Sequence, residues 1–259
     1  LNKPKQNSVI QNPPKEVISQ LANMYNQGQL SAVVEQAQAL IEQYPQAFIL
    51  WNLLGASASQ IGMLDQAVNA YKKAISLKPD YADAYCNMSV ALQNQDKLDK
   101  AIEACNKAIL LKPDYVVAYS NMGNALKLQG KLEEAIEAYK KAISLKPDYP
   151  DAYYNLGIAL QDQGKLEEAI NNYKAAILYK PNYVLAYSNI GNILKYQGKL
   201  DEAIDAYKKS ISFKPDYAEA HHNLSFALLN KGNLKKSVNE YEWRWRTSKN
   251  MQEMRKFSQ

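Results

Sequence analysis

The chain has 259 residues and a formal net charge of +5 at pH 7. It contains no apolar run long enough to cross a membrane and no signal-peptide core at its N-terminus, and its charge is too small to indicate a nucleic-acid-binding surface. We therefore expect a soluble, cytoplasmic protein with no membrane insertion and no nucleic-acid partner.

The chain begins with an irregular segment and continues with a strict period. Residues 1–13 contain Lys, Asn, Gln and Pro and almost no apolar side chains, which predicts an extended leader. Six prolines then recur at a constant interval, at Pro45, Pro79, Pro113, Pro147, Pro181 and Pro215. Such a constant interval indicates a tandem array of one structural unit. The pattern places five regular units at residues 48–81, 82–115, 116–149, 150–183 and 184–217.

The first half of each regular unit has the pattern of a helix. In the unit 48–81, Trp51, Leu54 and Gly55 fall at positions i, i+3 and i+4, so they share one face of a helix. This face is predicted to be buried. The small residue on it lets a second helix pack closely.

The second half of each regular unit predicts a turn, a second helix and a stop. Gly62 and its equivalents supply the turn, because glycine readily adopts backbone angles that other residues avoid. Asp96 takes this place in one unit. The proline at the end of the unit terminates the second helix, since proline lacks an N–H group and clashes with the preceding turn.

The order of aromatic, aliphatic, small and proline positions resembles the tetratricopeptide repeat (TPR) family. In the first regular unit the matching residues are Trp51, Leu54, Gly55, Ala67, Tyr71, Ala74 and Pro79. The resemblance implies an all-α fold, a right-handed superhelical solenoid of antiparallel helix pairs whose first helices line the concave side. It also implies that ligand contacts come from first-helix positions beside the packing face.

The unit before the regular array is degenerate. Residues 14–47 keep Gly28 and Pro45, but Gln20 and Leu21 stand where an aliphatic and a small residue belong. Such a departure is expected of a terminal unit, which has only one neighbour to pack against. We predict that this unit caps the array.

The unit after the regular array is degenerate too. Residues 218–246 place His221 at the aromatic position and carry Trp243 and Trp245 near their end. Two interpretations of this end remain open. One is a capping helix, and the other is a junction that leads into a transferase domain, as in bacterial TPR proteins. Residues 247–259 are polar and predict a tail or a continuing helix.

An asparagine recurs on the first helices, immediately before the aliphatic residue of the packing face. One asparagine falls at this position in each of five successive units, at Asn87, Asn121, Asn155, Asn189 and Asn223. An exposed helical position has little packing reason to carry the same amide five times, and an amide both donates and accepts hydrogen bonds. We therefore predict a ladder of exposed amides that holds the main chain of an extended peptide.

Two units extend this face with further polar residues. They carry Asn124 and Lys127 in one case, and Asn192 and Lys195 in the other. These units resemble the TPR superhelix of O-linked N-acetylglucosamine transferases, whose asparagine ladder holds substrate peptides. The resemblance stops with the repeats, since the chain contains nothing of a glycosyltransferase domain. The first regular unit has Leu53 at the ladder position, so we expect this end of the groove to be more apolar.

The remaining reactive residues predict no chemistry. The sequence has no phosphate-binding glycine loop and no nucleophile motif, so we expect no enzyme activity and no cofactor. Cys105 replaces the core aromatic of its unit, Cys86 is expected on a first-helix face away from the core, and both are expected to be reduced. Adjacent His221 and His222 lie on different helix faces. We expect packing for the first, exposure for the second, and no metal.

The second helices carry charges at helical spacing. Glu137 with Lys141 and Asp205 with Lys209 are expected to form i, i+4 pairs. This pattern predicts a solvated face on the second helices.

These features predict a protein-protein interaction scaffold that binds a peptide or partner segment in the concave groove. The alternative is the substrate-recognition region of a larger bacterial transferase, of the glycosyl-, sulfo- or methyltransferase type, whose catalytic domain is absent from this chain. The degenerate first unit and the tryptophan-containing end are the places where an end-to-end homo-oligomer would form, because apolar surface lacks an internal neighbour there.

Overall fold

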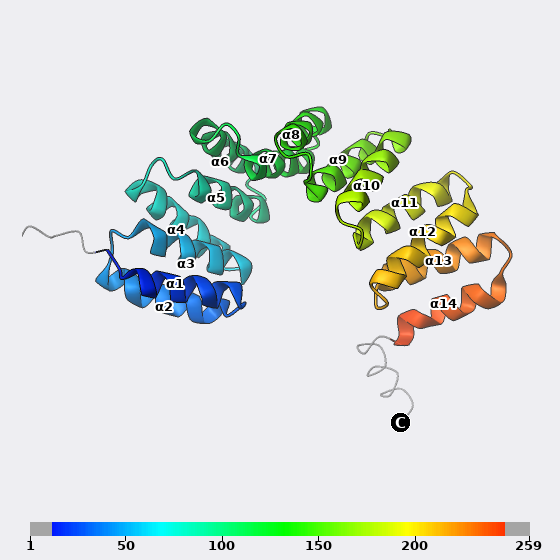
Figure 1. Cartoon of the computed structure of the whole chain (residues 1–259), viewed down its shortest axis with the longest axis horizontal. Helices are drawn as coiled ribbons and strands as arrows, with labels where there is room; N and C mark the ends of the chain where they lie inside the picture. The colour runs from blue at the N-terminus through cyan, green and yellow to red at the C-terminus, as the bar shows by residue number, and fades with distance from the viewer. Residues whose placement is uncertain (1–11, 247–259) are drawn as a thin grey trace, which may run out of the picture. The chain divides into compact units, whose positions relative to one another are not determined.

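The structure is a computed structural model that describes residues 12–246, which form seven antiparallel helix pairs and no strand (Figure 1). The first helices of the pairs are α1 (Lys15–Asn26), α3 (Phe48–Gln60), α5 (Ala82–Asn94), α7 (Val116–Leu128), α9 (Pro150–Asp162), α11 (Val184–Tyr196) and α13 (Ala218–Asn230). The second helices are α2 (Leu30–Gln43), α4 (Leu64–Leu77), α6 (Leu98–Leu111), α8 (Leu132–Leu145), α10 (Leu166–Tyr179), α12 (Leu200–Phe213) and α14 (Leu234–Arg246). The predicted all-α class is confirmed.

The helices group into two compact units. The first unit, residues 1–145, contains α1 to α8, and the second unit, residues 146–259, contains α9 to α14. Within each unit, consecutive helices pack against one another. First helices also touch the next first helix, as in α3 with α5, α5 with α7, and α11 with α13. None of the helices in the described part of the chain is long and apolar enough to span a bilayer.

A residue with a left-handed backbone forms the turn inside most helix pairs. The turn glycines Gly28, Gly62, Gly130, Gly164, Gly198 and Gly232 have φ between 74° and 82°. In the pair α5–α6 the turn residue is Asp96, with φ of 58°. Aspartate is among the few residues other than glycine that visit this conformation, because its short polar side chain can bond locally. The turn predicted from the sequence is therefore confirmed.

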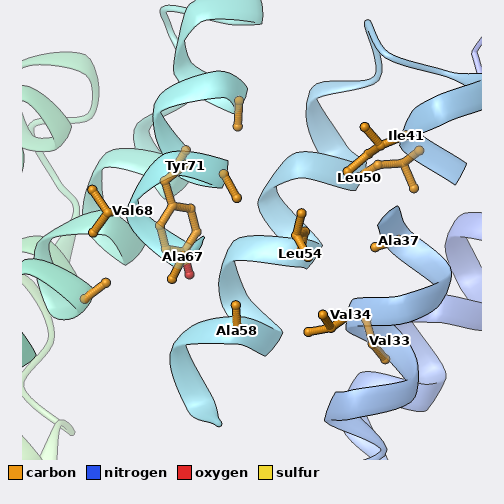
Figure 2. Packing of buried hydrophobic residues seen from close by; sticks show 14 of the residues in the cluster. Val33, Val34, Ala37, Ile41, Leu50, Leu54, Ala58, Ala67, Val68 and Tyr71 are labelled. Carbon is orange, nitrogen blue, oxygen red and sulfur yellow. The ribbon is translucent and has the colours of Figure 1, made fainter. Parts of the chain in front are cut away.

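Four of the five regular pairs bury a tyrosine of the second helix over a glycine of the first. Figure 2 shows Tyr71 of α4 packed beside α3, and a Cβ atom added to Gly55 would lie 2.8 Å from the Tyr71 ring. Tyr71 is 2% exposed. Gly157 faces Tyr173 in the same way, at 2.5 Å. A side chain at these glycines would force the two helices apart.

Two pairs have facing core residues of other sizes. In α1–α2 the sizes are exchanged: Leu21 on the first helix is 1% exposed and Ala37 on the second is fully buried. In α5–α6 both residues are small, since Ser89 stands opposite Cys105. Complementary volume across the two helices, and not a fixed residue at each position, is what the core needs.

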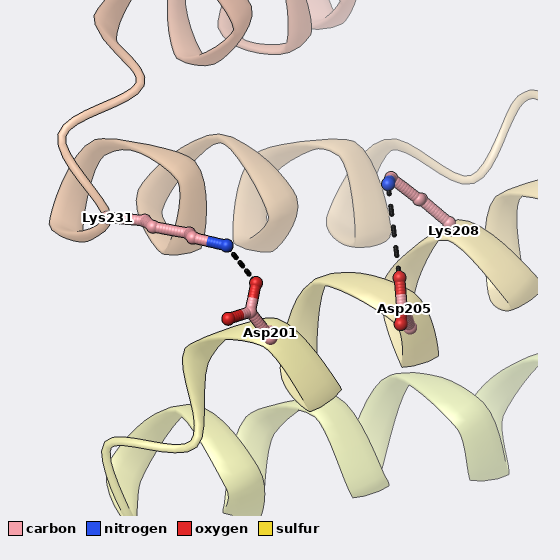
Figure 3. Close-up of polar contacts among 4 residues, drawn as sticks. All are labelled: Asp201, Asp205, Lys208 and Lys231. Atoms are coloured by element: carbon pink, nitrogen blue, oxygen red, sulfur yellow. Dashed lines mark hydrogen bonds and ion pairs between the residues drawn. The ribbon is translucent and has the colours of Figure 1, made fainter.

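Within each unit, polar side chains link several pairs to the next. Gln95 Nε2 donates to Asp65 Oδ1 at 2.9 Å, and Gln197 Nε2 donates to Glu167 Oε1 at 3.0 Å. Lys231 makes the corresponding bond to Asp201, as Figure 3 shows. Each bond joins the end of one first helix to the start of the preceding second helix.

The ion pairs on the second helices differ from those expected. Asp205 pairs with Lys208 at 3.9 Å (Figure 3), and Glu137 pairs with Lys140 at 2.9 Å, so the spacing is i, i+3. The predicted partners Lys209 and Lys141 are exposed. Both spacings bring side chains together on a helix, so the sequence alone does not choose between them. Because the pairs are exposed, they add little stability.

The location predicted for Cys86 was wrong. Cys86 is 1% exposed and packs with Ala108 and Ala118, because the next first helix, α7, covers it. Cys105 is fully buried as predicted, and both thiols are free. Burial raises the pKa of the Cys86 thiol to about 11 and that of Cys105 to about 12.

The C-terminal pair uses a histidine in place of the aromatic residue. The Nδ1 atom of His221 lies 2.6 Å from Glu240 Oε2, its Nε2 atom lies 3.0 Å from the Pro215 carbonyl oxygen, and its ring stacks on Trp243 at 3.9 Å. The predicted packing role of His221 is confirmed. His222 is half-buried against Phe226 and is less exposed than predicted. The side chain of Trp245, the tail 247–259 and nearly all of the leader lie outside the described residues.

Candidate functional site

Four first helices present one comparable face, which we call the asparagine stripe. Its residues fall at i, i+4, i+7 and i+11, a spacing that places them on one side of a helix. They are Asp83, Asn87, Val90 and Asn94 on α5; Val117, Asn121, Asn124 and Leu128 on α7; Asp151, Asn155, Ile158 and Asp162 on α9; and Leu185, Asn189, Asn192 and Tyr196 on α11. Asn223 of α13 occupies the ladder position in the last pair.

The ladder asparagines are less exposed than the sequence predicts. Asn87, Asn121, Asn155, Asn189 and Asn223 are all half-buried. In two cases the neighbouring first helix provides a hydrogen-bond partner. The side-chain amides of Asn87, Asn155 and Asn223 have no hydrogen-bond partner among residues 12–246.

On α7, two asparagines each use one polar atom of the side-chain amide in a hydrogen bond within the protein and keep the other atom free. Asn121 Nδ2 donates to Cys86 Sγ at 3.4 Å, which leaves its Oδ1 acceptor free. Asn124 Oδ1 accepts the hydroxyl proton of Tyr139 at 2.7 Å, which leaves its Nδ2 donor free. Neither free atom is buried. One turn of helix therefore offers an acceptor and, three residues on, a donor.

The helix α11 repeats this division with other partners. Asn189 Nδ2 donates to the hydroxyl oxygens of Tyr154 and Tyr173, at 3.4 and 3.3 Å. Asn192 Oδ1 accepts the hydroxyl proton of Tyr207 at 2.8 Å. Burial raises the pKa of Tyr173 and Tyr207 well above the usual tyrosine range, so both hydroxyls remain protonated.

Two acids of this face have hydrogen-bond partners within the described part of the chain, whereas its lysines have no acidic partner there. Asp83 and Asp151 accept hydrogen bonds from the Tyr115 and Tyr183 hydroxyls at 2.7 and 2.9 Å. Lys127 and Lys195 are half-buried in the last turns of α7 and α11, and neither has an acidic partner in the described part of the chain. The Lys195 ammonium lies over the ring of Tyr196, 5.6 Å from its centroid.

The first regular pair lacks the ladder. Leu53 stands at the ladder position and is half-buried, and the adjacent Asn52 is buried with its Oδ1 unpaired. Residues 12–246 contain no group of three or more His, Cys, Asp or Glu that could hold a metal ion.

Sequence reasoning found the asparagines but missed their hydrogen-bond partners. Tyr139 and Tyr207 occupy the core position of Tyr71 in their units, and their hydroxyls also fix the orientation of the neighbouring amides. A signal was present, because Asn124 and Asn192 stand in alternate units, whereas the ladder asparagines stand in five successive units. That longer interval marks a two-repeat pattern.

Comparisons with known proteins identify the repeat. A family model described as "TPR repeat" matches residues 59–96, 123–164, 160–195 and 191–232, and two described as "Tetratricopeptide repeat" match residues 82–115 and 104–137. The chain belongs to the tetratricopeptide repeat family. As an array of such repeats with a polar face on its first helices, it is a protein-interaction scaffold. The matched models identify the repeat, and the resemblance to O-linked N-acetylglucosamine transferases stays a prediction.

Individual relatives match parts of the chain. A 70-residue segment is 30% identical to the peroxisomal targeting signal receptor of Candida glabrata, over 27% of this chain and 12% of the receptor. The corresponding receptor of Candida albicans is 34% identical over 70 residues, with the same shares covered. The chain thus spans about an eighth of the length of these relatives.

Solved structures match over longer stretches. The structure of MamA is 30% identical and has a TM-score of 0.57, covering 64% of this chain and 97% of MamA. The Cut9–Hcn1 hetero-tetramer structure has a TM-score of 0.72 at 18% identity, covering 92% of this chain and 47% of that one, and shows the fold alone.

Proposed function

We propose that the chain binds an extended peptide segment of a partner protein along the asparagine stripe, and that it acts by binding without catalysing a reaction. The observation that carries the proposal is the division of amide groups on α7 and α11. Asn121 and Asn189 have free acceptors, whereas Asn124 and Asn192 have free donors.

This division suits the main chain of a peptide. An extended peptide presents N–H donors and C=O acceptors in alternation, and both must find partners when they leave water. A fixed acceptor beside a fixed donor satisfies one of each without reading side chains. Because buried tyrosine hydroxyls and neighbouring helices hold these amides, little side-chain entropy is lost on binding. One relative is by name a receptor for a targeting signal, which agrees with this function.

The test uses short peptides selected on the full chain from a random phage-displayed library. In the variant with Asn121, Asn155 and Asn189 changed to Ala, a peptide bound within one unit loses one or two bonds of about 0.5–1.5 kcal/mol each, so we expect its affinity to fall about two- to a hundredfold. Calorimetry measures the affinity, and circular dichroism monitors the fold. The matched control changes Asn69, Asn106 and Asn171, exposed asparagines of α4, α6 and α10, to Ala.

A second variant replaces each free donor by a charged acceptor oxygen. Asn124→Asp and Asn192→Asp keep an oxygen for the tyrosine hydroxyls but lose the free N–H groups. We expect binding to weaken with the melting temperature nearly unchanged. Equal binding by wild type, the alanine variant and the aspartate variant would reject the asparagine stripe as the binding surface.

The second candidate is the substrate-recognition region of a larger transferase, and one observation favours a further partner at the C-terminal end. Leu234, Val238 and Tyr241 of α14 are 63%, 45% and 37% exposed. The equivalent Ile204 and Tyr207 of α12 are 5% and 0% exposed, since α13 covers them. A chain longer than residue 259, a separate partner, or a second copy bound end to end would bury this face. Thermal unfolding of a longer natural chain tests it, with a higher melting temperature expected.

A further inference from the structure

The chemistry of the asparagine stripe alternates from one first helix to the next. On α5 and α9 the stripe begins with an acid and has a branched aliphatic residue at its third position. On α7 and α11 it begins with an aliphatic residue, has a second asparagine at the third position, and ends on a large apolar residue. The residues that match across two repeats are Val117 and Leu185, Asn124 and Asn192, Lys127 and Lys195, and Leu128 and Tyr196.

The hydrogen bonds explain why lysine stands only on alternate helices. On α9, Gln161 Oε1 accepts the hydroxyl proton of the core residue Tyr173 at 2.9 Å. On α7 and α11 the second asparagine of the stripe accepts the core tyrosine's proton instead. On α7 and α11 the residue equivalent to Gln161 therefore does not need to accept the tyrosine hydroxyl. Lys127 and Lys195 occupy this position.

These lysines are cations without a counter-charge. Both are half-buried, and neither forms an ion pair in the described part of the chain. Of the three acids on the stripe, Asp83 and Asp151 already accept tyrosine hydroxyls, and Asp162 of α9 forms no ion pair with either lysine. A partly desolvated ammonium group gains more from an anion than a fully solvated one does. The surface therefore has a place for a negative charge beside Asn124, and another beside Asn192.

Apolar side chains stand at both ends of the same two stripes. Val117 and Leu185 are each 43% exposed, Leu128 is 59% exposed and Tyr196 is 84% exposed. The corresponding residues of α5 and α9 are polar: Asp83, Asn94, Asp151 and Asp162. Apolar side chains of a bound segment could leave water against these exposed residues, which is favourable.

We propose that the chain carries two equivalent peptide sites, one on α5–α7 in the first unit and one on α9–α11 in the second. Each site takes a short extended segment with one anionic side chain, which pairs with Lys127 or Lys195, and with apolar residues on either side of it. The proposal rests on the proposed peptide-binding function and deepens it, because it names the ligand chemistry and a stoichiometry of two. The anion is a carboxylate or a phosphorylated hydroxyl, since both present oxygens to an ammonium group.

The test repeats the library selection on wild type and on a variant with Lys127→Gln and Lys195→Gln. Glutamine is the residue that α5 and α9 already carry at this position, as Gln93 and Gln161, so the fold is expected to tolerate it. We expect peptides selected on wild type to be enriched in Asp or Glu between apolar residues, and peptides selected on the variant to lose the acidic residue. Calorimetry on one synthetic wild-type-selected peptide is expected to give two peptides per chain.

Single variants and modified peptides sharpen the result. Lys127→Gln alone is expected to leave one site at full strength and to weaken the other about tenfold, the loss of one charge-assisted bond. In two further peptides the acidic residue is replaced by its amide or by phosphoserine. The amide peptide is expected to bind about tenfold more weakly to wild type. Whichever of the acidic and phosphorylated peptides binds more tightly identifies the preferred anion.

The outcomes separate this inference from the function on which it rests. Peptides that depend on the asparagines but show no acidic preference, or that bind one per chain, overturn the two-site inference and leave peptide binding in place. Selection that yields no peptide sensitive to the asparagine variants overturns both. Acidic enrichment that persists in the double lysine variant shows that the anion binds elsewhere and also overturns the inference.

Discussion

The helices α5 to α8 (residues 82–145) in the first unit and α9 to α12 (residues 150–213) in the second are two versions of one two-repeat segment. Comparing them reverses the usual pattern, in which buried residues vary less than exposed ones. Several buried positions differ: Ser89 and Cys105 in the first segment correspond to Gly157 and Tyr173 in the second. The asparagine stripe, which is partly open to solvent, keeps its chemistry at nearly every position. Packing requires only complementary volumes, whereas a ligand surface requires particular groups. The comparison therefore supports a binding role for the stripe.

The largest expected difference between the segments concerns alkaline pH, because only the first contains buried thiols. Burial raises the pKa of Cys86 from 9.0 to about 11. Below pH 9 this thiol is protonated in both states and its stabilisation is fully present. Above pH 9 the unfolded chain loses a proton that the folded chain retains, so the free energy of unfolding falls by up to about 3 kcal/mol as pH rises through 11.

Urea unfolding between pH 8 and 11 measures this dependence. The matched control is a Cys86→Ser variant, because α7 and α11 carry serine at the equivalent position, as Ser120 and Ser188. This variant is expected to lose less stability as the pH rises. An identical pH dependence in both proteins contradicts the prediction.

The second prediction concerns the different core solutions of the two segments. Gly157→Leu is expected to destabilise the second unit by about 1–3 kcal/mol, because any Cβ there meets the Tyr173 ring at 2.5 Å. Gly157→Ser alone should also destabilise, but Gly157→Ser with Tyr173→Cys reproduces the serine and cysteine of α5–α6. We expect the double variant to be more stable than the sum of its single changes predicts. Additive losses in urea unfolding would show that the two volumes are independent.

The third prediction concerns a bond that the two segments share. Tyr115→Phe and Tyr183→Phe each remove a hydroxyl that donates to an aspartate, Asp83 or Asp151. Each change is expected to cost about 1 kcal/mol of unfolding free energy, and the two losses should be similar. Tyr196→Phe is the control, since Tyr196 is 84% exposed. A loss in only one segment would mean that the two are not equivalent.

The smallest expected effect concerns the turns. Asp96 has φ of 58°, where the second segment has Gly164 with φ of 76°. Asp96→Gly is expected to stabilise by up to about 1 kcal/mol and Gly164→Asp to destabilise by a similar amount, because a side chain disfavours this conformation. Thermal melts of the two reciprocal variants measure the effect. Shifts of the same sign would disprove the explanation.

The fold could be predicted from the sequence because the constant repeat period fixes helices, turns and core positions together. The burial of Cys86 could not, since it depends on how closely α7 approaches α5. The orientation of the amides could not be predicted either, because Tyr139 and Tyr207 reach them from the second helices of their pairs. Hydrogen bonds between helices depend on side-chain geometry that periodicity alone does not specify.

The most direct test of the two equivalent surfaces locates the bound peptide. A selected peptide carrying a photoreactive phenylalanine analogue next to its acidic residue is cross-linked to the full chain, and the attachment sites are identified by mass spectrometry. The two-site inference predicts attachment to α7 and, in similar yield, to α11, near Leu128 and Tyr196. Attachment confined to the second helices, or to one of the two segments, would contradict it.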